Sequence, residues 1–308
     1  MKGARVKPHT RATSLHPRLI AITGIATALL LLSGCAAAVD PSKDNAPVAA
    51  FAHIHALAVD PTSGELLVAT HEGIYALDPN AGTATGIRGP LGGLDFDPMG
   101  FTVLGATAYA SGHPGPSTPA EFGAPNLGLI RSDDGGVTWT TLALRGETDF
   151  HVVTAGAVRG DAPDVIYGLD SGSGVVRISD DGGYNWVAGA AVPARTILAD
   201  PIIAKRIYAT TADGLAVSAD GALTFTIDTS APVLYLIAAD QAGGLVGIDT
   251  VGDIWSRATS GPWAAGGAVN GTVQAIIVDG NRLYVADDRG VVYTDDRGET
   301  WVVLAPTG

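Results

Sequence analysis

Cysteine, aromatic residues and helix-like periodicity are all scarce in this chain, and these scarcities limit the classes of fold and of metal site that it can form. A single cysteine, Cys35, rules out a disulfide-stabilised scaffold and a cysteine-rich zinc site. Aromatic residues make up 6%, but hydrophobic residues reach 46%, which is enough for a sizeable core. No stretch from 53 to 306 has the 3.6-residue hydrophobic period of a helix. With Gly 41 and Pro 18, the 308 residues therefore indicate short strands joined by turns.

Positive charge is also scarce outside the first 34 residues. Residues 1–34 carry five Lys or Arg and no acid, whereas the rest has 13 basic and 31 acidic residues, a net charge of −18. Only two lysines, Lys43 and Lys205, lie in this remainder. Such a surface repels phosphate backbones and anionic headgroups, so we expect no nucleic-acid partner.

The N-terminal segment has the pattern of an export signal. A 14-residue apolar run, Leu19 to Leu32, follows a basic stretch and is short for a transmembrane helix but suited to a signal-peptide core. The run ends in Leu-Ser-Gly-Cys35, which resembles the bacterial lipobox; the alternative is an ordinary small-residue cleavage site. We therefore expect a signal peptide over 1–34. Lipidated Cys35 and a tether over 35–48 would hold a monomer at the extracytoplasmic face of a bacterial membrane.

Four copies of one short motif, Ser/Thr-x-Asp-x-Gly-x-Thr-Trp, recur in the rest of the chain. They start at 132, 179, 218 and 294, separated by 47, 39 and 76 residues, and 76 is two steps of 38. A degenerate fifth copy is expected at Gly247–Trp255. In each copy the Asp accepts hydrogen bonds from a turn and the aromatic residue packs under it. The positions of these pairs are Asp134 and Trp139, Asp181 and Trp186, Asp220 and Phe225, and Asp296 and Trp301.

The motif and its spacing resemble the Asp-box, or BNR, repeat of sialidases, sortilin-type receptors and xyloglucan hydrolases. In those families the box joins the third and fourth strands of a propeller blade, so the resemblance implies an all-β propeller and says little about function. Residues 53–306 hold six units of about 42 residues, the size of four short strands. We predict a six-bladed β-propeller over 49–308, because a seventh blade would need a unit that the sequence does not contain. How the ring closes is left open, with 47–51 as a candidate outer strand.

Aligning the blades brings the histidines together. The start of the first strand and the end of the second strand of each blade lie on one face of a propeller, beside the channel. His55, Met99 and His151 are at first-strand starts, and His71 and His113 are at second-strand ends. All lie in the first three blades, and no histidine follows His151. The alignment predicts that these residues converge at one mouth of the channel.

Imidazoles with a thioether suit a transition metal, Cu or Zn. The predicted ligands are His55, His71, His113 and His151 with Met99, and His53, Asp170 and Asp249 are predicted to stand behind them, a carboxylate orienting an imidazole by accepting its other N–H. Two other interpretations are open: an organic-ligand site, or histidines hydrogen-bonded to water and backbone at the channel mouth.

The strings HIHALAVDP, ATHEGIY, MGFTVLG, ASGHPGP and DFHVV resemble a bacterial lineage of BNR-repeat lipoproteins labelled as predicted glycosylhydrolases. The resemblance covers 52 to about 183 and includes the five histidines and Met99. Sialidase machinery is missing, because the Arg-Ile-Pro motif is absent and Arg195 alone is placed to face the channel. For a two-carboxylate glycosidase, Glu72 is the one glutamate near the proposed face, and Asp170, Asp249 and Asp287 could supply a pair, although an Asp at a blade turn is more often a structural cap. We expect a binding or assembly module for a protein or small ligand, with a glycoside hydrolase as the alternative.

One insertion, 111–126, follows the second strand of the second blade on the histidine face. Its Pro/Gly-rich sequence fits a lid over the channel mouth or a plain solvated connection, and the sequence does not separate the two.

Overall fold

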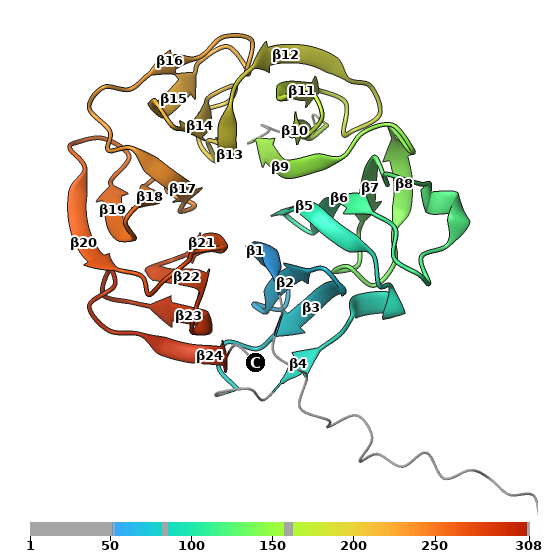
Figure 1. Cartoon of the computed structure of the whole chain (residues 1–308), viewed down its shortest axis with the longest axis horizontal. Coiled ribbons are helices and arrows are strands. Elements are labelled where there is room, and N and C mark those ends of the chain that lie inside the picture. The colour runs from blue at the N-terminus through green and yellow to red at the C-terminus, as the bar shows by residue number, and fades with distance from the viewer. Residues whose placement is uncertain (1–50, 52, 82–85, 157–162, 307–308) are drawn as a thin grey trace, which may run out of the picture. The chain divides into compact units, whose positions relative to one another are not determined.

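The computed structural model describes residues 51, 53–81, 86–156 and 163–306. Within them the chain forms a six-bladed β-propeller whose first strands surround a central opening (Figure 1). The predicted signal peptide, Cys35 and the tether lie outside the described residues. In the part of the chain that is described, no helix is long and apolar enough to cross a membrane.

Each blade is a four-stranded antiparallel sheet built from four consecutive strands. The blades consist of β1 (Ile54–Val59), β2 (Leu66–Thr70), β3 (Gly73–Leu77) and β4 (Ile87–Arg88); β5 (Asp97–Leu104), β6 (Thr107–His113), β7 (Leu129–Ser132) and β8 (Thr140–Ala143); β9 (Phe150–Gly156), β10 (Val165–Asp170), β11 (Val175–Ser179) and β12 (Val187–Ala191); β13 (Ala194–Ala199), β14 (Ile207–Thr211), β15 (Gly214–Ser218) and β16 (Thr226–Ile227); β17 (Leu234–Ala239), β18 (Leu245–Asp249), β19 (Asp253–Arg257) and β20 (Ala264–Ala268); and β21 (Ala275–Asp279), β22 (Arg282–Asp287), β23 (Gly290–Thr294) and β24 (Val302–Pro306). Two short 3-10 turns, η2 (Leu91–Gly93) and η3 (Ala120–Phe122), lie in connections.

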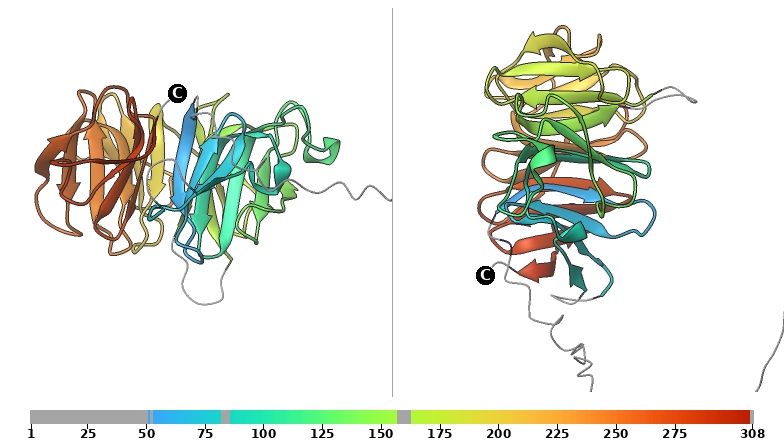
Figure 2. Two further views of the ribbon diagram at one scale, coloured as in Figure 1. Left: turned by 90° about the horizontal axis from the view of Figure 1, so that it is seen from below. Right: turned by 90° about the vertical axis from the view of Figure 1, so that its right-hand side faces the viewer.

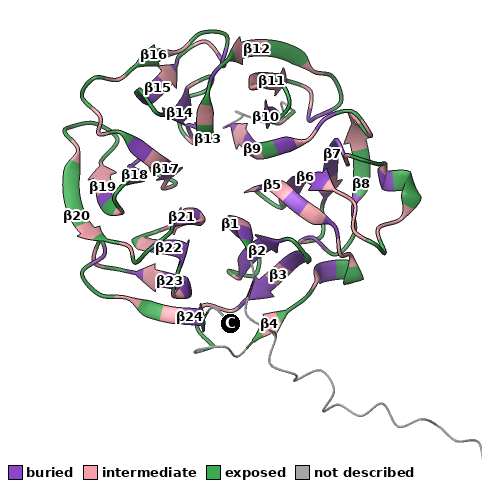
Figure 3. Ribbon diagram, in the orientation of Figure 1, coloured by how far each residue is buried: buried purple, intermediate pink, exposed green. Residues whose placement is uncertain are grey.

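Burial follows strand position within the blade. The second strands β2 and β14 are buried at every residue, because neighbouring blades cover both of their faces. The sequences of both strands are therefore continuous runs of apolar or small residues and do not alternate between apolar and polar residues. The outer strands β16 and β20 are mostly exposed, as the colouring of Figure 3 shows.

Six apolar clusters, one at each blade interface, form the core. The cluster between the second and third blades is built on Tyr109, Phe150 and Ile166, all at most 1% exposed. A similar cluster joins the sixth blade to the first, where Ile54 and Leu57 pack with Tyr284 and Leu304. The ring thus closes by face-to-face packing of complete blades.

A hydrogen bond across the same junction accompanies this packing. The Ile54 N–H donates to Oε1 of Gln274 at 2.7 Å. Of the segment 47–51, suggested as an outer strand, only Phe51 is described, and its ring packs edge-on against Tyr75 at 5.3 Å.

In four of the six blades, the turn between the third and fourth strands has the same set of hydrogen bonds. In the second blade, Asp134 Oδ1 accepts the backbone N–H of Val137 and Thr138, and the Trp139 indole donates to the Gly136 carbonyl at 2.9 Å. The third, fourth and sixth blades repeat the carboxylate contacts around Asp181, Asp220 and Asp296. Ala222 occupies the glycine position of the fourth blade and keeps the positive φ, at 66°.

The fifth copy predicted at Gly247–Trp255 is wrong in position. This segment spans β18 and β19, so its turn joins the second strand to the third. Asp249 accepts the N–H of Val251 and Asp253 and the Trp255 indole, which imitates the motif at the opposite end of the blade. The true third-to-fourth turn lies between β19 and β20 and carries Trp263, stacked under Arg257 at 4.9 Å.

Candidate functional site

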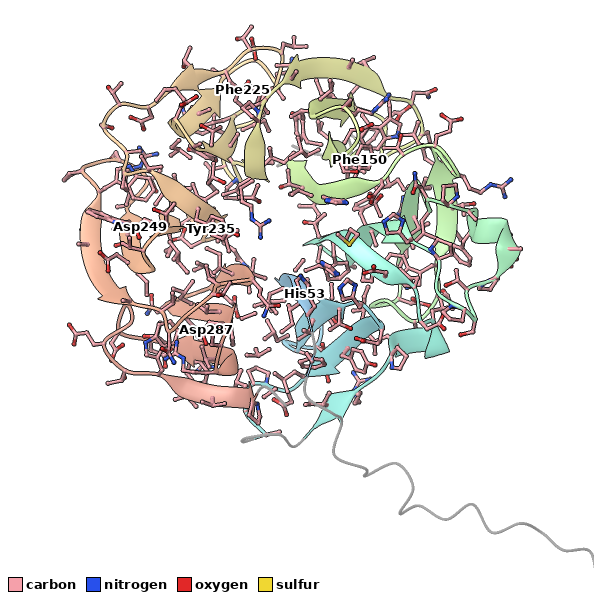
Figure 4. All side chains as sticks on the ribbon, in the orientation of Figure 1. His53, Phe150, Phe225, Tyr235, Asp249 and Asp287 are labelled. Carbon is pink, nitrogen blue, oxygen red and sulfur yellow. The ribbon has the colours of Figure 1, made fainter. Side chains whose placement is uncertain are left out.

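A central cavity of about 750 Å³ runs between the six first strands. Seen from the side, the strands of each blade run from one face of the ring toward the other, so strand ends gather at two faces (Figure 2). The structure places His53, His55, Met99 and His151 on this cavity. Arg195, Tyr235 and Gln274, the corresponding residues of the last three blades, line it as well. Figure 4 shows His53 and Tyr235 at the central opening, and Asp249 and Asp287 farther out.

The histidines do not converge on one point, which corrects the predicted single site. His71 and His113 lie at second-strand ends, one step outward from the cavity lining. Two separate clusters result: His53, His55 and His71, and His113, Asp149 and His151. The reason is the packing of blades face to face, which sets the end of each second strand beside the first strand of the next blade.

The first cluster consists of three imidazoles in mutual contact. The ring centroids of His53 lie 4.9 Å from His55 and 5.0 Å from His71, and those of His55 and His71 are 4.5 Å apart. One nitrogen of each residue lies within 4.8 Å of the others. His53 immediately precedes β1 and His55 lies within it, where the β1–β2 register shifts between Ile54 and Ala56.

A carboxylate from the next blade closes this cluster. Asp97 Oδ2 is 3.0 Å from His71 Nδ1, and Oδ1 is 3.0 Å from His55 Nε2. The Oδ1 atom is buried and has no partner with hydrogen-bond geometry. Burial alone would raise the pKa of Asp97, but the two facing imidazoles outweigh it and lower that pKa.

Protonating all three adjacent imidazoles would place three positive charges in contact, which electrostatic repulsion disfavours. Burial and the neighbouring His55 and His71 lower the pKa of His53, so the neutral form is favoured there. Neutral imidazole is the form that binds metal ions. The trio and its carboxylate therefore offer a compact set of nitrogen donors beside a negative charge, and these residues fit a bound cation.

The second cluster repeats the arrangement one blade further along. Asp149 Oδ2 lies 2.7 Å from His151 Nε2 and 3.4 Å from His113 Nε2. Burial opposes ionisation of Asp149, but the His151 hydrogen bond and both imidazoles lower its pKa. The same hydrogen bond raises the pKa of His151.

The two carboxylates predicted to orient imidazoles have other partners. Asp170 accepts the N–H of Gly172 and Ser173 and pairs with Arg177 at 3.1 Å. Asp249 caps its turn and holds the Trp255 indole. A carboxylate at the end of a second strand is used by the tight turn that follows, so neither orients an imidazole. His53, also predicted as a supporting residue, belongs to the first cluster itself.

The carboxylates that do contact histidines, Asp97 and Asp149, were missed in the sequence. A signal was present: His53, Asp97 and Asp149 stand two residues before His55, Met99 and His151. Aligning that earlier position, at or just before the start of each first strand, would have placed polar side chains close to the predicted ligands.

The insertion after β6 is anchored outward and is not a lid. Its turn η3 contacts the outer strand β8, and Phe122 is buried in the core between the first two blades. Arg145 donates to the Glu121 carbonyl at 2.8 Å. The start of the segment contributes His113 to the site, and the Pro125 carbonyl near its end lies 3.3 Å from His113 Nδ1.

Comparison with known proteins supports the fold. No family model and no curated protein sequence matches this chain. Solved structures similar to it include an ancestral GH74 enzyme (TM-score 0.50), the PorZ surface component of the type-IX secretion system of Porphyromonas gingivalis (0.52) and a chain of the nidogen/laminin complex (0.56), each 16% identical. The matches cover 84%, 82% and 78% of this chain. They span only 39% of the GH74 enzyme and 32% of PorZ, but 93% of the chain from the nidogen/laminin complex. At this identity the likeness establishes a propeller and nothing more.

Proposed function

We propose that this protein is a non-catalytic binding or assembly propeller that holds a transition metal ion, Cu or Zn, at His53, His55 and His71. The observation that carries the proposal is the approach of one nitrogen from each imidazole to within 4.8 Å of the others. Three imidazoles suit Cu or Zn better than Mg or Ca. Asp97, which contacts His55 and His71, places a negative charge next to the three imidazoles and would favour a cation there.

The setting of this cluster favours binding of a further ligand. His53 and His55 line the cavity, and His53 is exposed, so an ion held there would be open to a donor group from a partner or small molecule. Structural metal sites are closed by protein ligands, whereas sites that take an outside ligand keep an open position. Met99 lies on the same cavity wall and would add a soft donor nearby.

The proposal also places the module outside the cell, tethered through lipidated Cys35. Its support is the leader sequence. We further assign the four repeated turns to the Asp-box class, on their shared motif and hydrogen bonds. In this assignment the boxes stabilise blades and take no part in binding.

Metal titration of the full-length protein in detergent tests the proposal. We expect binding of Cu²⁺ or Zn²⁺ tighter than micromolar at neutral pH, with one equivalent lost in His55→Ala. Tyr235→Phe, on the opposite cavity wall, is the matched control and should bind as wild type. Stoichiometry that His55→Ala leaves unchanged, or affinity weaker than micromolar for both ions, would overturn the assignment.

Glycoside hydrolysis is the rival function, and the contacts of this chain argue against it. Hydrolysis needs two carboxyl groups free to act on one bond. Asp170 and Asp249 hydrogen-bond their own turns, Asp287 pairs with Arg289, and Glu72 is exposed next to His71 in the chain. Turnover of sialosides or aryl glycosides that is lost on changing Asp170, Asp249 or Glu72 would establish the hydrolase instead.

A further inference from the structure

We infer that His113, Asp149 and His151 form a second metal site, which takes a divalent first-row ion such as Zn²⁺ or Mn²⁺ and acts independently of the first cluster. Its residues differ from those of the first cluster, and it lies at the next blade interface. One ligand atom from each of the three residues lies within 4.8 Å of the others.

Orientation of His113 is the first support. Its Nδ1 faces the Pro125 carbonyl at 3.3 Å, and a carbonyl can only accept, so Nδ1 carries the proton. In the neutral imidazole the other nitrogen, Nε2, then presents its lone pair toward Asp149, whose Oδ2 is 3.4 Å away. Metal-binding histidines commonly donate their second ring N–H to a carbonyl in this way, which fixes both tautomer and ring direction.

The environment of Asp149 is the second support. Its side chain is 10% exposed, and Oδ1 is buried without a hydrogen-bond partner. Oδ2 accepts the Ser171 hydroxyl and faces the two imidazoles. In the part of the chain that is described, no Arg or Lys forms an ion pair with Asp149. A buried carboxylate surrounded in this way lacks a permanent positive partner, which a divalent ion would supply.

Ligand chemistry separates the two clusters. The first offers three imidazoles, and the second offers two imidazoles and a carboxylate with exposed rings that leave coordination positions open. A two-histidine, one-carboxylate set accepts Zn²⁺ and also harder ions such as Mn²⁺, which an all-imidazole set holds less well. We therefore expect two equivalents of Zn²⁺ per chain but one of Mn²⁺.

The two clusters lie next to each other because the second blade contributes residues to both. Asp97, which contacts the first cluster, is the register partner of His113 across β5 and β6. A second-strand histidine meeting an Asp at the start of the next blade occurs twice, as His71 with Asp97 and as His113 with Asp149. After the third blade the corresponding positions carry no histidine, so the pattern ends there.

The test uses the full-length protein with Zn²⁺ titration and the electron paramagnetic resonance of bound Mn²⁺. We expect His113→Ala to bind one Zn²⁺ fewer and to weaken Mn²⁺ binding by at least tenfold, with loss of the bound spectrum. His71→Ala, the matched change in the first cluster, should lose the other Zn²⁺ and keep the Mn²⁺ spectrum. His151→Gln, at a side chain 46% exposed, guards against loss of folding and should behave as His113→Ala does.

The titrations distinguish refutation of the second site from refutation of the first. If His113→Ala and His151→Gln both keep wild-type Zn²⁺ stoichiometry and the Mn²⁺ spectrum, the second site is refuted. If wild type binds a single Zn²⁺ that His113→Ala loses and His71→Ala keeps, the second site stands and the first, on which the proposed function depends, is refuted.

Discussion

Asp97→Asn tests whether the carboxylate beside the first cluster contributes to metal affinity. The substitution keeps the shape of the side chain and removes its charge. Asp97 contacts two imidazoles, at 3.0 Å each, and its side chain is 21% exposed, so the lost charge is only partly screened by water.

The expected loss of metal affinity follows from these contacts. Loss of an outer partner of metal-bound histidines typically weakens affinity by about 10–100-fold, which corresponds to roughly 1.4–2.7 kcal/mol at about 1.4 kcal/mol per tenfold. An upper limit of about 4 kcal/mol comes from two unit charges 4 Å apart at an effective dielectric constant near 20. Because asparagine can still hydrogen-bond one imidazole, we expect an affinity loss near the lower end of this range.

Competition with a chelating dye measures this change. The full-length protein, Asp97→Asn and Asp249→Asn are titrated side by side at neutral pH. Asp249, the last residue of the second strand β18, hydrogen-bonds its own turn and the Trp255 indole and contacts no histidine, so its substitution should leave metal affinity unchanged. Unaltered affinity in Asp97→Asn, with affinity lost in His55→Ala, would refute the role given to the carboxylate.

Three further predictions concern stability and anchoring. Hydrogen bonds within the turns lower the pKa of three half-buried aspartates, Asp181, Asp220 and Asp296, from 3.8 to about 2. Because the fold favours their charged form, these carboxylates stabilise the folded state fully above about pH 4, and this stabilisation is lost as the pH falls toward 2. Urea unfolding at several pH values should therefore show the free energy of unfolding declining over that range. Replacing all three aspartates with Asn should make the decline shallower. Gly168→Ala should cost about 1–3 kcal/mol, since a Cβ there would lie 2.5 Å from the Phe150 ring, and Phe150→Leu should restore part of the loss in a double-mutant cycle by thermal unfolding. Cys35→Ser should move the protein from the membrane fraction to the soluble extracytoplasmic fraction of an expressing bacterium, and retention in the membrane would contradict lipid anchoring.

The sequence by itself determined the propeller and the number of its blades. Repeated turns at blade-sized spacing carry this information because each turn is local: the Asp134 carboxylate binds backbone three and four residues away, and the Trp139 indole binds a carbonyl three residues back. The same locality misled at Gly247–Trp255, where Asp, Gly and Trp form a similar turn at the other end of a blade.

The grouping of the histidines was decided only by the tertiary structure. Aligning strand ends placed His55, Met99 and His151 on the cavity, since strand position within a blade follows from the repeat. It did not show that His71 meets Asp97 or that His113 meets Asp149, because these pairs form between blades. Side chains at such interfaces are 26 and 36 residues apart and are brought together by packing of two sheets, for which no local pattern exists. One predicted site therefore became two clusters.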